Sequence, residues 1–463
     1  MDPVLSGIVG TLLVFFLLSL GMPIAFSMML VGFLGISFLS SVEAALPVLA
    51  RTVYETSSHY PYTVIPLFVV MGGFAGSSGM TRQLYAAFDK WLRVLPGGLG
   101  VATIGACAGF AGVSGSSVAT AAAMGTVAIP EMNRFGYSSR LSAGTVAAGG
   151  TLGFLIPPSI GFVVYGMLTE QSIGKLLIAG VAPGLLLALA YISIIISWVK
   201  ISPEVAPSSP EPVSWKEKFA SLMPVWEPLI IFLVVMGGIY LGFFTPTEAG
   251  GIGATMLFLV ALIKRKLQWP AFKVALLESV SISVMVLFLV AGANVFSTFL
   301  ALSTIPIQVS TWVVSLEVSR YIVLTIVILI YLFLGCFLDA ISMMVLTMPV
   351  IYPVIINLGF NPIWFGVIAV LMMEAGLLTP PMGLNVFTVA GVAKDVPLES
   401  IYRGILPFLI SIFVVVFFII LFPKLAISAS SKKWQRTQSA DSRRMTILSL
   451  TSSRHSAVSS LQD

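Results

Sequence analysis

A pair of adjacent prolines, Pro380 and Pro381, interrupts an apolar stretch from Met372 to Gly391 that is long enough to cross a membrane. Two consecutive prolines remove two backbone donors and clash with the preceding turn, so a regular helix cannot continue through them. Inside a bilayer, the unpaired backbone groups of such a break are tolerated only where protein buries them or where they line a wet cavity. The rest of the chain must therefore enclose this break. Glu374, just upstream, adds an ionisable group, and such a group inside a membrane indicates a functional site.

The composition confines the chain to a membrane. Of its 463 residues, 58% are hydrophobic and 9% are charged, and the mean hydropathy is +1.04. Soluble domains carry about 25% charged residues, so this chain cannot cover a water-facing surface. We therefore predict an all-α polytopic membrane protein. Cys107 and Cys336 both lie in apolar segments, and we expect them to be packing residues without a disulfide or a metal site.

The break at Pro380 has a twin 223 residues earlier, at Pro157 and Pro158. The same spacing, to within one residue, relates four further pairs: Pro23 and Pro246, Pro130 and Pro353, Gly136 and Gly359, and Pro183 and Pro407. Chance does not readily supply five matches in the same order. We predict two repeats, 1–199 and 225–423, joined by a Pro- and Ser-rich linker at 200–224. The Ser-, Thr- and Arg-rich tail at 424–463 is expected to be disordered.

Each repeat also contains a candidate re-entrant hairpin. The first segment, 98–130, includes GVSGSSVA at Gly112–Ala119, which is too flexible for the centre of an ordinary spanning helix. Taken alone, this segment fits a hairpin with a Ser/Gly tip and a single helix packed through small residues equally well. Ser116 at its centre falls on Asp339, so we expect a matching hairpin at 321–357. The two breaks then divide spanning helices at 141–168 and 361–392.

The distribution of basic residues addresses the orientation of the repeats. With a non-crossing hairpin, each repeat has about five spanning helices, and this odd number inverts the second repeat relative to the first. If the linker is cytoplasmic, fourteen Lys and Arg residues fall on inner segments and three, Arg51, Lys175 and Arg320, on outer ones. This bias agrees with the positive-inside rule and supports two inverted repeats. The basic residues of the tail, such as Lys432 and Lys433, disagree, so the side of the tail stays open.

This combination is typical of a secondary transporter with its site near the midplane. Hairpin tips and unwound breaks bring together backbone carbonyls and Ser, Thr and Asn oxygens, which suit a monovalent cation such as Na⁺. Helix N-termini directed at the same point favour an anionic substrate group. No ATP-binding GxxxxGK[ST] motif occurs. We expect no enzymatic activity, since no HExxH or GxSxG motif occurs and His59 and His455 lie outside the predicted core.

Three motifs carry a resemblance to a known family: GFAGVSGSSVATAAAMG at Gly109–Gly125, GTLGFLIPPSIGFVVYG at Gly150–Gly166, and EAGLLTPPMGLNVF at Glu374–Phe387. Together, within a similarity that covers about residues 3–423, they resemble the large membrane subunit of tripartite ATP-independent periplasmic (TRAP) transporters. The resemblance implies a bacterial inner-membrane protein that imports an organic acid, such as a C4-dicarboxylate or sialic acid, with Na⁺ as the coupling ion and no cofactor. It also implies an elevator mechanism, with a scaffold domain and a moving transport domain.

The resemblance further implies two partners. One is a small four-helix membrane subunit, which we expect to be a separate polypeptide, and the other is a soluble periplasmic substrate-binding protein. The alternative is a stand-alone Na⁺/dicarboxylate or citrate carrier of similar architecture, which would not depend on a binding protein.

Carried over by position, the resemblance predicts two Na⁺ sites, each between a hairpin tip and a break. The expected Na⁺ residues are Gly112, Ser114, Gly115, Ser116, Pro157 and Gly161 in the first repeat, and Asp339, Ser342, Thr379, Gly383 and Asn385 in the second. The substrate carboxylate would lie between the tips, with Ser116, Ser117, Pro158, Asp339, Pro381 and Asn385 as expected contacts. Asp339 either binds the ion or holds its hairpin. We expect Glu374 to be structural and to accept amides freed by the break.

Overall fold

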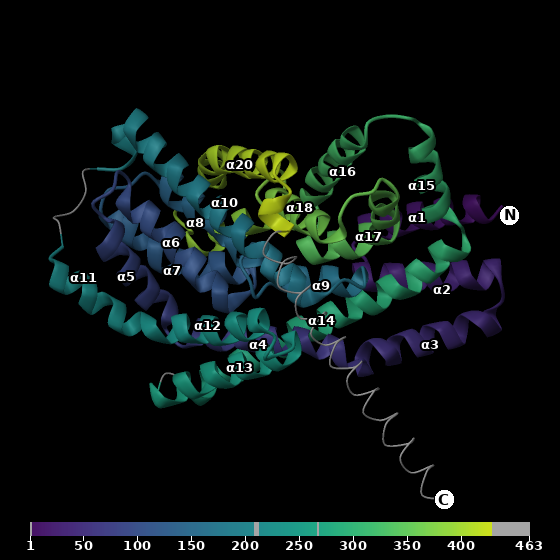
Figure 1. Ribbon diagram of the computed structural model, residues 1–463, viewed down its shortest axis with the longest axis horizontal. Helices are drawn as coiled ribbons and strands as arrows, with labels where there is room; N and C mark the ends of the chain where they lie inside the picture. The colour runs from purple at the N-terminus through teal and green to yellow at the C-terminus, as the bar shows by residue number, and fades with distance from the viewer. Residues whose placement is uncertain (1, 208–212, 266–267, 428–463) are drawn as a thin grey trace, which may run out of the picture.

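The computed structural model describes residues 2–207, 213–265 and 268–427, and this part of the chain folds into helices without a strand (Figure 1). Among the described residues, seven helices are long and apolar enough to cross a membrane, or eight if one bent pair counts as a single span. The predicted all-α, multi-pass membrane architecture is therefore confirmed. The tail predicted to be disordered spans residues 424–463. Almost all of it, residues 428–463, lies outside the described residues.

The helices of the first half are α1 (Pro3–Ser19), α2 (Ile24–Leu39), α3 (Val42–Ser58), α4 (Val64–Ser77), α5 (Met80–Leu92), α6 (Gly98–Ser114), α7 (Ser117–Arg134), α8 (Ser139–Leu155), α9 (Ile160–Leu168) and α10 (Ile173–Ile201). Those that follow are α11 (Trp215–Leu222), α12 (Trp226–Leu241), α13 (Pro246–Ile263), α14 (Trp269–Leu302), α15 (Ile305–Ser315), α16 (Arg320–Gly335), α17 (Ala340–Asn357), α18 (Pro362–Gly376), α19 (Leu384–Val392) and α20 (Leu398–Leu421). α11 lies within the segment expected to be a linker.

The spacing of 223 residues recurs in the helix boundaries. α7 covers residues 117–134 and α17 covers residues 340–357, and the other helices of the two halves correspond in the same order. One place differs, because α3 and α4 together correspond to the single 34-residue helix α14. Pro61 lies in the turn between α3 and α4, where its missing donor interrupts the helix. Its counterpart in α14 is Val284, which a helix accommodates.

The helices pack into two groups that meet at the hairpins. In one group α14 packs on α2, α3 and α4, and α13 packs on α4 and α12. These helices run along the lower side of the molecule in Figure 1. In the other group α8 is the centre, and α6, α7, α10, α18 and α20 pack around it. The core of α8 is dense in glycine and alanine, so neighbouring backbones approach it closely.

Candidate functional site

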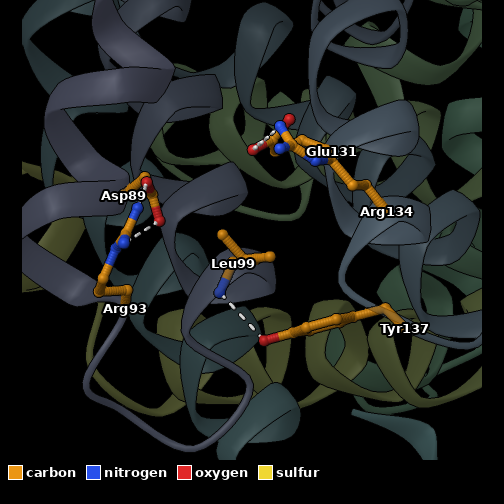
Figure 2. Close-up of polar contacts among 6 residues, drawn as sticks. All are labelled: Asp89, Arg93, Leu99, Glu131, Arg134 and Tyr137. Carbon is orange, nitrogen blue, oxygen red and sulfur yellow. Dashed lines mark hydrogen bonds and ion pairs between the residues drawn. The ribbon is translucent and has the colours of Figure 1, made fainter. Parts of the chain in front are cut away.

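The first predicted hairpin is formed by α6 and α7, which meet at Gly115 and Ser116. Gly115 has a φ of +65°, a value that glycine adopts readily and that lets the chain reverse. The Ser116 hydroxyl caps α7 by accepting the Ala119 N–H at 3.3 Å. At the other end of the hairpin, the Leu99 N–H donates to the Tyr137 hydroxyl at 3.3 Å (Figure 2). The structure therefore has a hairpin and not a single helix packed through small residues.

Polar groups outside the spanning segments lie beside the base of this hairpin. Figure 2 shows Asp89 and Arg93 of α5 paired beside the base, and the pair is largely shielded from solvent. Burial raises the pKa of Tyr137, which follows the end of α7. The Leu99–Tyr137 hydrogen bond joins the two ends of the hairpin at its base, whereas the Asp89–Arg93 pair lies within one stretch of chain beside it.

The tip of the first hairpin contacts the first break, as expected. The Ile160 N–H, at the start of α9, donates to the Gly115 carbonyl at 3.3 Å. The Pro158 carbonyl lies against Gly115, and a Cβ atom added there would be 2.6 Å from its oxygen. Ser159 closes the break by accepting the Phe162 N–H at 3.3 Å and donating to the Phe154 carbonyl. Carbonyl and hydroxyl oxygens therefore surround this contact.

The first tip also borders a cavity of about 570 Å³ between the two helix groups. Its polar and glycine lining comes from both groups: Ser114 and Ser116 at the tip, Gly72, Gly73, Gly76 and Ser77 of α4, and Glu278 and Ser279 of α14. Sequence reasoning missed Glu278, for which the only signal was a single carboxylate in an apolar segment. Gly112, an expected Na⁺ residue, faces elsewhere, because a Cβ added to it would lie 2.8 Å from Phe232 of α12.

The second hairpin is formed by α16 and α17 and also contacts its break. Asp339 caps α17, since its Oδ2 accepts the N–H groups of Ile341 and Ser342, each at 3.1 Å. A cavity of about 230 Å³ joins the tip to the break and is lined by Gly335, Phe337, Leu338, Asp339, Met382, Leu384 and Phe387. Of the two roles considered for Asp339, these two bonds support holding the hairpin. They do not use Oδ1.

The two breaks differ in their exposure. Pro157, Pro158 and Gly161 are buried, whereas Pro380 and Pro381 are exposed. Both proline pairs are joined by a cis peptide bond. In the second break, the Tyr402 hydroxyl donates to the Pro381 carbonyl at 2.7 Å. The two breaks are therefore not equivalent, as the different residues that follow each proline pair suggested.

The remaining expected site residues of the second repeat point in different directions. The Thr379 hydroxyl donates to the Ala375 carbonyl at 2.8 Å, and this bond leaves the lone pairs of the hydroxyl oxygen free. Gly383 begins α19 with a φ of +46°. Ser342 faces another cavity, of about 490 Å³, which is bordered by α2 and α14. Ser342 and Asp339 thus line different cavities, although the Ser342 N–H donates to Asp339.

The second half of each broken helix packs on the opposite repeat. α9 contacts α17, and α19 contacts α7 and α8. Asn385 lies on the buried face of α19 with Val386 and Val389, while Leu384 and Phe387 face the second hairpin. Neither amide atom of Asn385 has a hydrogen-bond partner among the described residues. Asn385 is thus directed away from the cavity that Asp339 lines.

The expectation that Glu374 accepts amides freed by the break is wrong. Its carboxyl group is fully buried, and neither oxygen has a hydrogen-bond partner among the described residues. The freed amides bond to the main chain instead: Leu378 to the Ala375 carbonyl, Thr379 to the Gly376 carbonyl, and Asn385 to the Leu377 carbonyl, at 2.9–3.2 Å. The break is tight enough to satisfy its own donors, so Glu374 has a different role.

Two hairpin tips, each held against a broken membrane helix, define the class of secondary transporters built from internal repeats. The family model of the tripartite ATP-independent periplasmic transporter, DctM component, matches residues 11–425, and the chain belongs to this family. It is therefore a TRAP transporter large permease of the bacterial inner membrane.

Individual relatives agree with this assignment. The C4-dicarboxylate TRAP transporter large permease protein DctM of Pseudomonas aeruginosa is 38% identical over 387 residues, which cover 83% of this chain and 89% of that protein. The sialic acid TRAP transporter large permease protein SiaM of Vibrio cholerae is 31% identical over 410 residues, which cover 88% and 94%. The YdaH transporter of Alcanivorax borkumensis, described as having an unusual topology, matches with a TM-score of 0.60 at 14% identity, over 84% of this chain and 88% of that chain. This last likeness concerns the fold alone.

Proposed function

We propose that the chain is the large membrane subunit of a Na⁺-coupled importer of an organic acid, which a periplasmic binding protein delivers. The contact between the first tip and the first break, where Ile160 donates to Gly115, is the observation that carries this proposal. It gathers backbone carbonyls and Ser hydroxyls at one buried point, and oxygen ligands of low charge suit Na⁺.

The substrate is proposed to be a carboxylate. Relatives are named for C4-dicarboxylates and for sialic acid, and both are organic acids. α7 and α9 both begin at the first tip, so two helix N-termini, with their positive dipole ends, face the same region. We place the carboxylate there, near Ser116 and Ser117, in the cavity that Ser116 borders.

The transport movement is proposed to be of the elevator type. Both hairpins and both broken helices belong to the group around α8 or pack on it, while α14 belongs to the other group. The cavity at the first tip lies between the two groups and is lined by small residues of α4, such as Gly72 and Gly76. Small side chains at this boundary would let the group around α8 slide past α4 and α14.

The partners are proposed to be a small four-helix membrane subunit and a soluble substrate-binding protein. The proposal is tested by reconstituting the chain in liposomes with both partners and measuring uptake of a labelled C4-dicarboxylate and of sialic acid. We expect uptake of an organic acid only with an inward Na⁺ gradient and only with the binding protein. Uptake without the Na⁺ gradient would contradict Na⁺ coupling, and uptake without the binding protein would favour a stand-alone carrier.

A further inference from the structure

Glu374 of α18 is a completely buried carboxyl group that the proposed transport cycle does not use. Its exposed fraction is 0%, and neither of its oxygens has a hydrogen-bond partner among the described residues. None of the ion pairs between described residues includes it. A charged carboxylate without a partner is strongly disfavoured in such a place, so it must be neutralised by a bound cation or by a proton.

Two polar groups of the first repeat, Ser117 and Tyr191, lie near Glu374. The hydroxyl of Ser117, in the first turn of α7, lies beside the carboxyl group. Tyr191 of α10 lies close enough to interact with its charge. α18 packs directly on α8 and α10, which brings these elements together behind the first hairpin tip. The carboxyl group thus lies on α18 near helices of the first repeat, with Ser117, at the start of α7 in the first hairpin, beside it.

The hydrogen bonds of Tyr191 and Ser117 determine which protons and lone pairs they can offer to Glu374. The Thr151 hydroxyl donates its proton to the Ala148 carbonyl at 2.6 Å, so Tyr191 must be the donor in its 2.9 Å bond with Thr151. Tyr191 therefore has no proton left for Glu374, and its oxygen presents only lone pairs. Ser117 carries one hydroxyl proton and two lone pairs. Of these two neighbours only Ser117 has a hydroxyl proton to offer, and both have oxygen lone pairs, which a cation beside the carboxylate could use.

We propose that Glu374 is the anionic ligand of a buried monovalent-cation site, with Ser117 as a second ligand, between α7, α10 and α18. A divalent ion is disfavoured, because no group of three or more His, Cys, Asp or Glu side chains gathers in the described residues and Ca²⁺ takes six to eight oxygen ligands. Because Ser117 follows Ser116 at the start of α7, this site adjoins the proposed first tip site and adds a carboxylate that the tip itself lacks. It would link the second broken helix to the first hairpin through an ion.

The test measures binding of radioactive Na⁺ to the full chain purified in detergent, so it is independent of substrate uptake. Substituting Glu374→Gln keeps the shape of the side chain and removes its charge, and we expect this variant to bind one Na⁺ fewer per chain. Glu317→Gln removes an exposed carboxylate that lines neither tip cavity and is the matched control, with unchanged stoichiometry expected. Glu374→Asp keeps the charge on a shorter side chain, and we expect it to keep the stoichiometry with weaker affinity.

Equal Na⁺ stoichiometry in wild type and Glu374→Gln would overturn the proposal and assign a proton to the carboxyl group. If Glu374→Gln does not fold, infrared difference spectroscopy of the wild-type chain decides the question. We expect Na⁺ to remove the carbonyl band of a protonated buried carboxyl group as the ion replaces the proton. A protonated-carboxyl band that Na⁺ leaves unchanged would contradict a cation at Glu374. If uptake fails but the wild type still binds one more Na⁺ than Glu374→Gln, the result contradicts the proposed transport function and leaves the site at Glu374 intact.

Discussion

The carbonyl oxygen of Pro158 occupies the place where a side chain at residue 115 would begin, because a Cβ atom added to Gly115 would be 2.6 Å from it. The first tip can therefore rest on the first break only because it has glycine at this position. The left-handed φ of +65° at Gly115 adds a second reason for glycine. One residue thus fixes both the reversal of the hairpin and its contact with the broken helix.

Gly115→Ala is expected to separate the tip from the break. The new methyl group would clash with the Pro158 carbonyl. A residue with a Cβ would also lose about 1–2 kcal/mol of stability in the left-handed backbone conformation. We expect loss of Na⁺-dependent uptake from a chain that still inserts in the membrane. Gly237→Ala is the control, since Gly237 lies in α12 outside the lining of this cavity and a Cβ there meets open space. Equal activity in both variants would contradict a role for the tip contact.

Ser116→Ala is expected to raise the Na⁺ concentration needed for half-maximal uptake. The substitution removes a hydroxyl at the proposed first Na⁺ site, and it also removes the cap of α7, a loss of about 0.5–2 kcal/mol. Ser138→Ala removes the equivalent cap of α8, which accepts the Leu141 N–H at 3.4 Å, without touching the tip. Na⁺ titrations of uptake compare the two variants, and the same shift in both would trace the effect to capping instead of ion binding.

The prolines and the repeat allowed much of the site to be predicted from the sequence. Pro157, Pro158, Pro380 and Pro381 act through their own missing donors and rigid rings, so their effect is local and survives in any fold. The hairpins were located to within about four residues, because the tips at Gly115 and Asp339 use glycine and capping chemistry that the sequence displays. The pairing of each tip with its own break came from the family resemblance, and the bond from the Ile160 N–H to the Gly115 carbonyl agrees with it in the first repeat.

The orientation of individual side chains could not be predicted in the same way. Asn385 and Leu384 are neighbours in the sequence, yet α19 turns the first toward α7 and α8 and the second toward the other hairpin. Which face is buried depends on the packing of α19 across the two repeats. Glu374 was misjudged for a related reason, because the break satisfies its own amides through main-chain bonds.

If Asn385 binds Na⁺, as the family resemblance implies, it does so on the buried face of α19, which packs on α7 and α8. Asn385→Ala is then expected to lower Na⁺ affinity while leaving the ion-free protein as stable as the wild type. Both amide atoms of Asn385 are buried without a partner, so truncation breaks no hydrogen bond among the described residues. Thermal unfolding with and without Na⁺ measures both quantities, and we expect a reduced stabilisation by Na⁺.

Asn361→Ala is the control, because it loses bonds to the Ile363 and Trp364 amides at 3.0 and 3.1 Å. This loss should lower stability by about 1 kcal/mol and leave the Na⁺ effect intact. Undiminished Na⁺ stabilisation in Asn385→Ala would place the ion elsewhere.

Gly376→Ala is expected to destabilise the crossing of α16 and α18. A Cβ atom at Gly376 would lie 2.5 Å from the Gly335 Cα, so the two backbones cross in contact and cannot admit a methyl group without moving apart. Overpacking of this kind costs about 1–3 kcal/mol, and we expect a lower midpoint of thermal unfolding. Gly391→Ala, at a position with open space around it, should leave the midpoint unchanged. Equal midpoints in the two variants would show that the crossing of α16 and α18 accommodates a methyl group without loss of stability.

Lys264→Met is expected to destabilise the chain more than the double substitution Glu227→Leu with Lys264→Met. Lys264 forms an ion pair with Glu227, whose exposed fraction is 7%, and donates to the Gln83 amide oxygen at 3.2 Å, so it joins α5, α12 and the end of α13. Removing the lysine alone leaves a buried carboxylate without a counter-charge, a loss of about 3–5 kcal/mol, whereas two apolar side chains can pack in place of the ion pair.

Arg51→Met is the control, because it breaks an exposed pair with Glu55 that contributes less than about 1 kcal/mol. Midpoints of thermal unfolding in detergent measure all three variants. A double variant as unstable as Lys264→Met would show that the hydrogen bond to Gln83, and not the buried charge, holds these helices together.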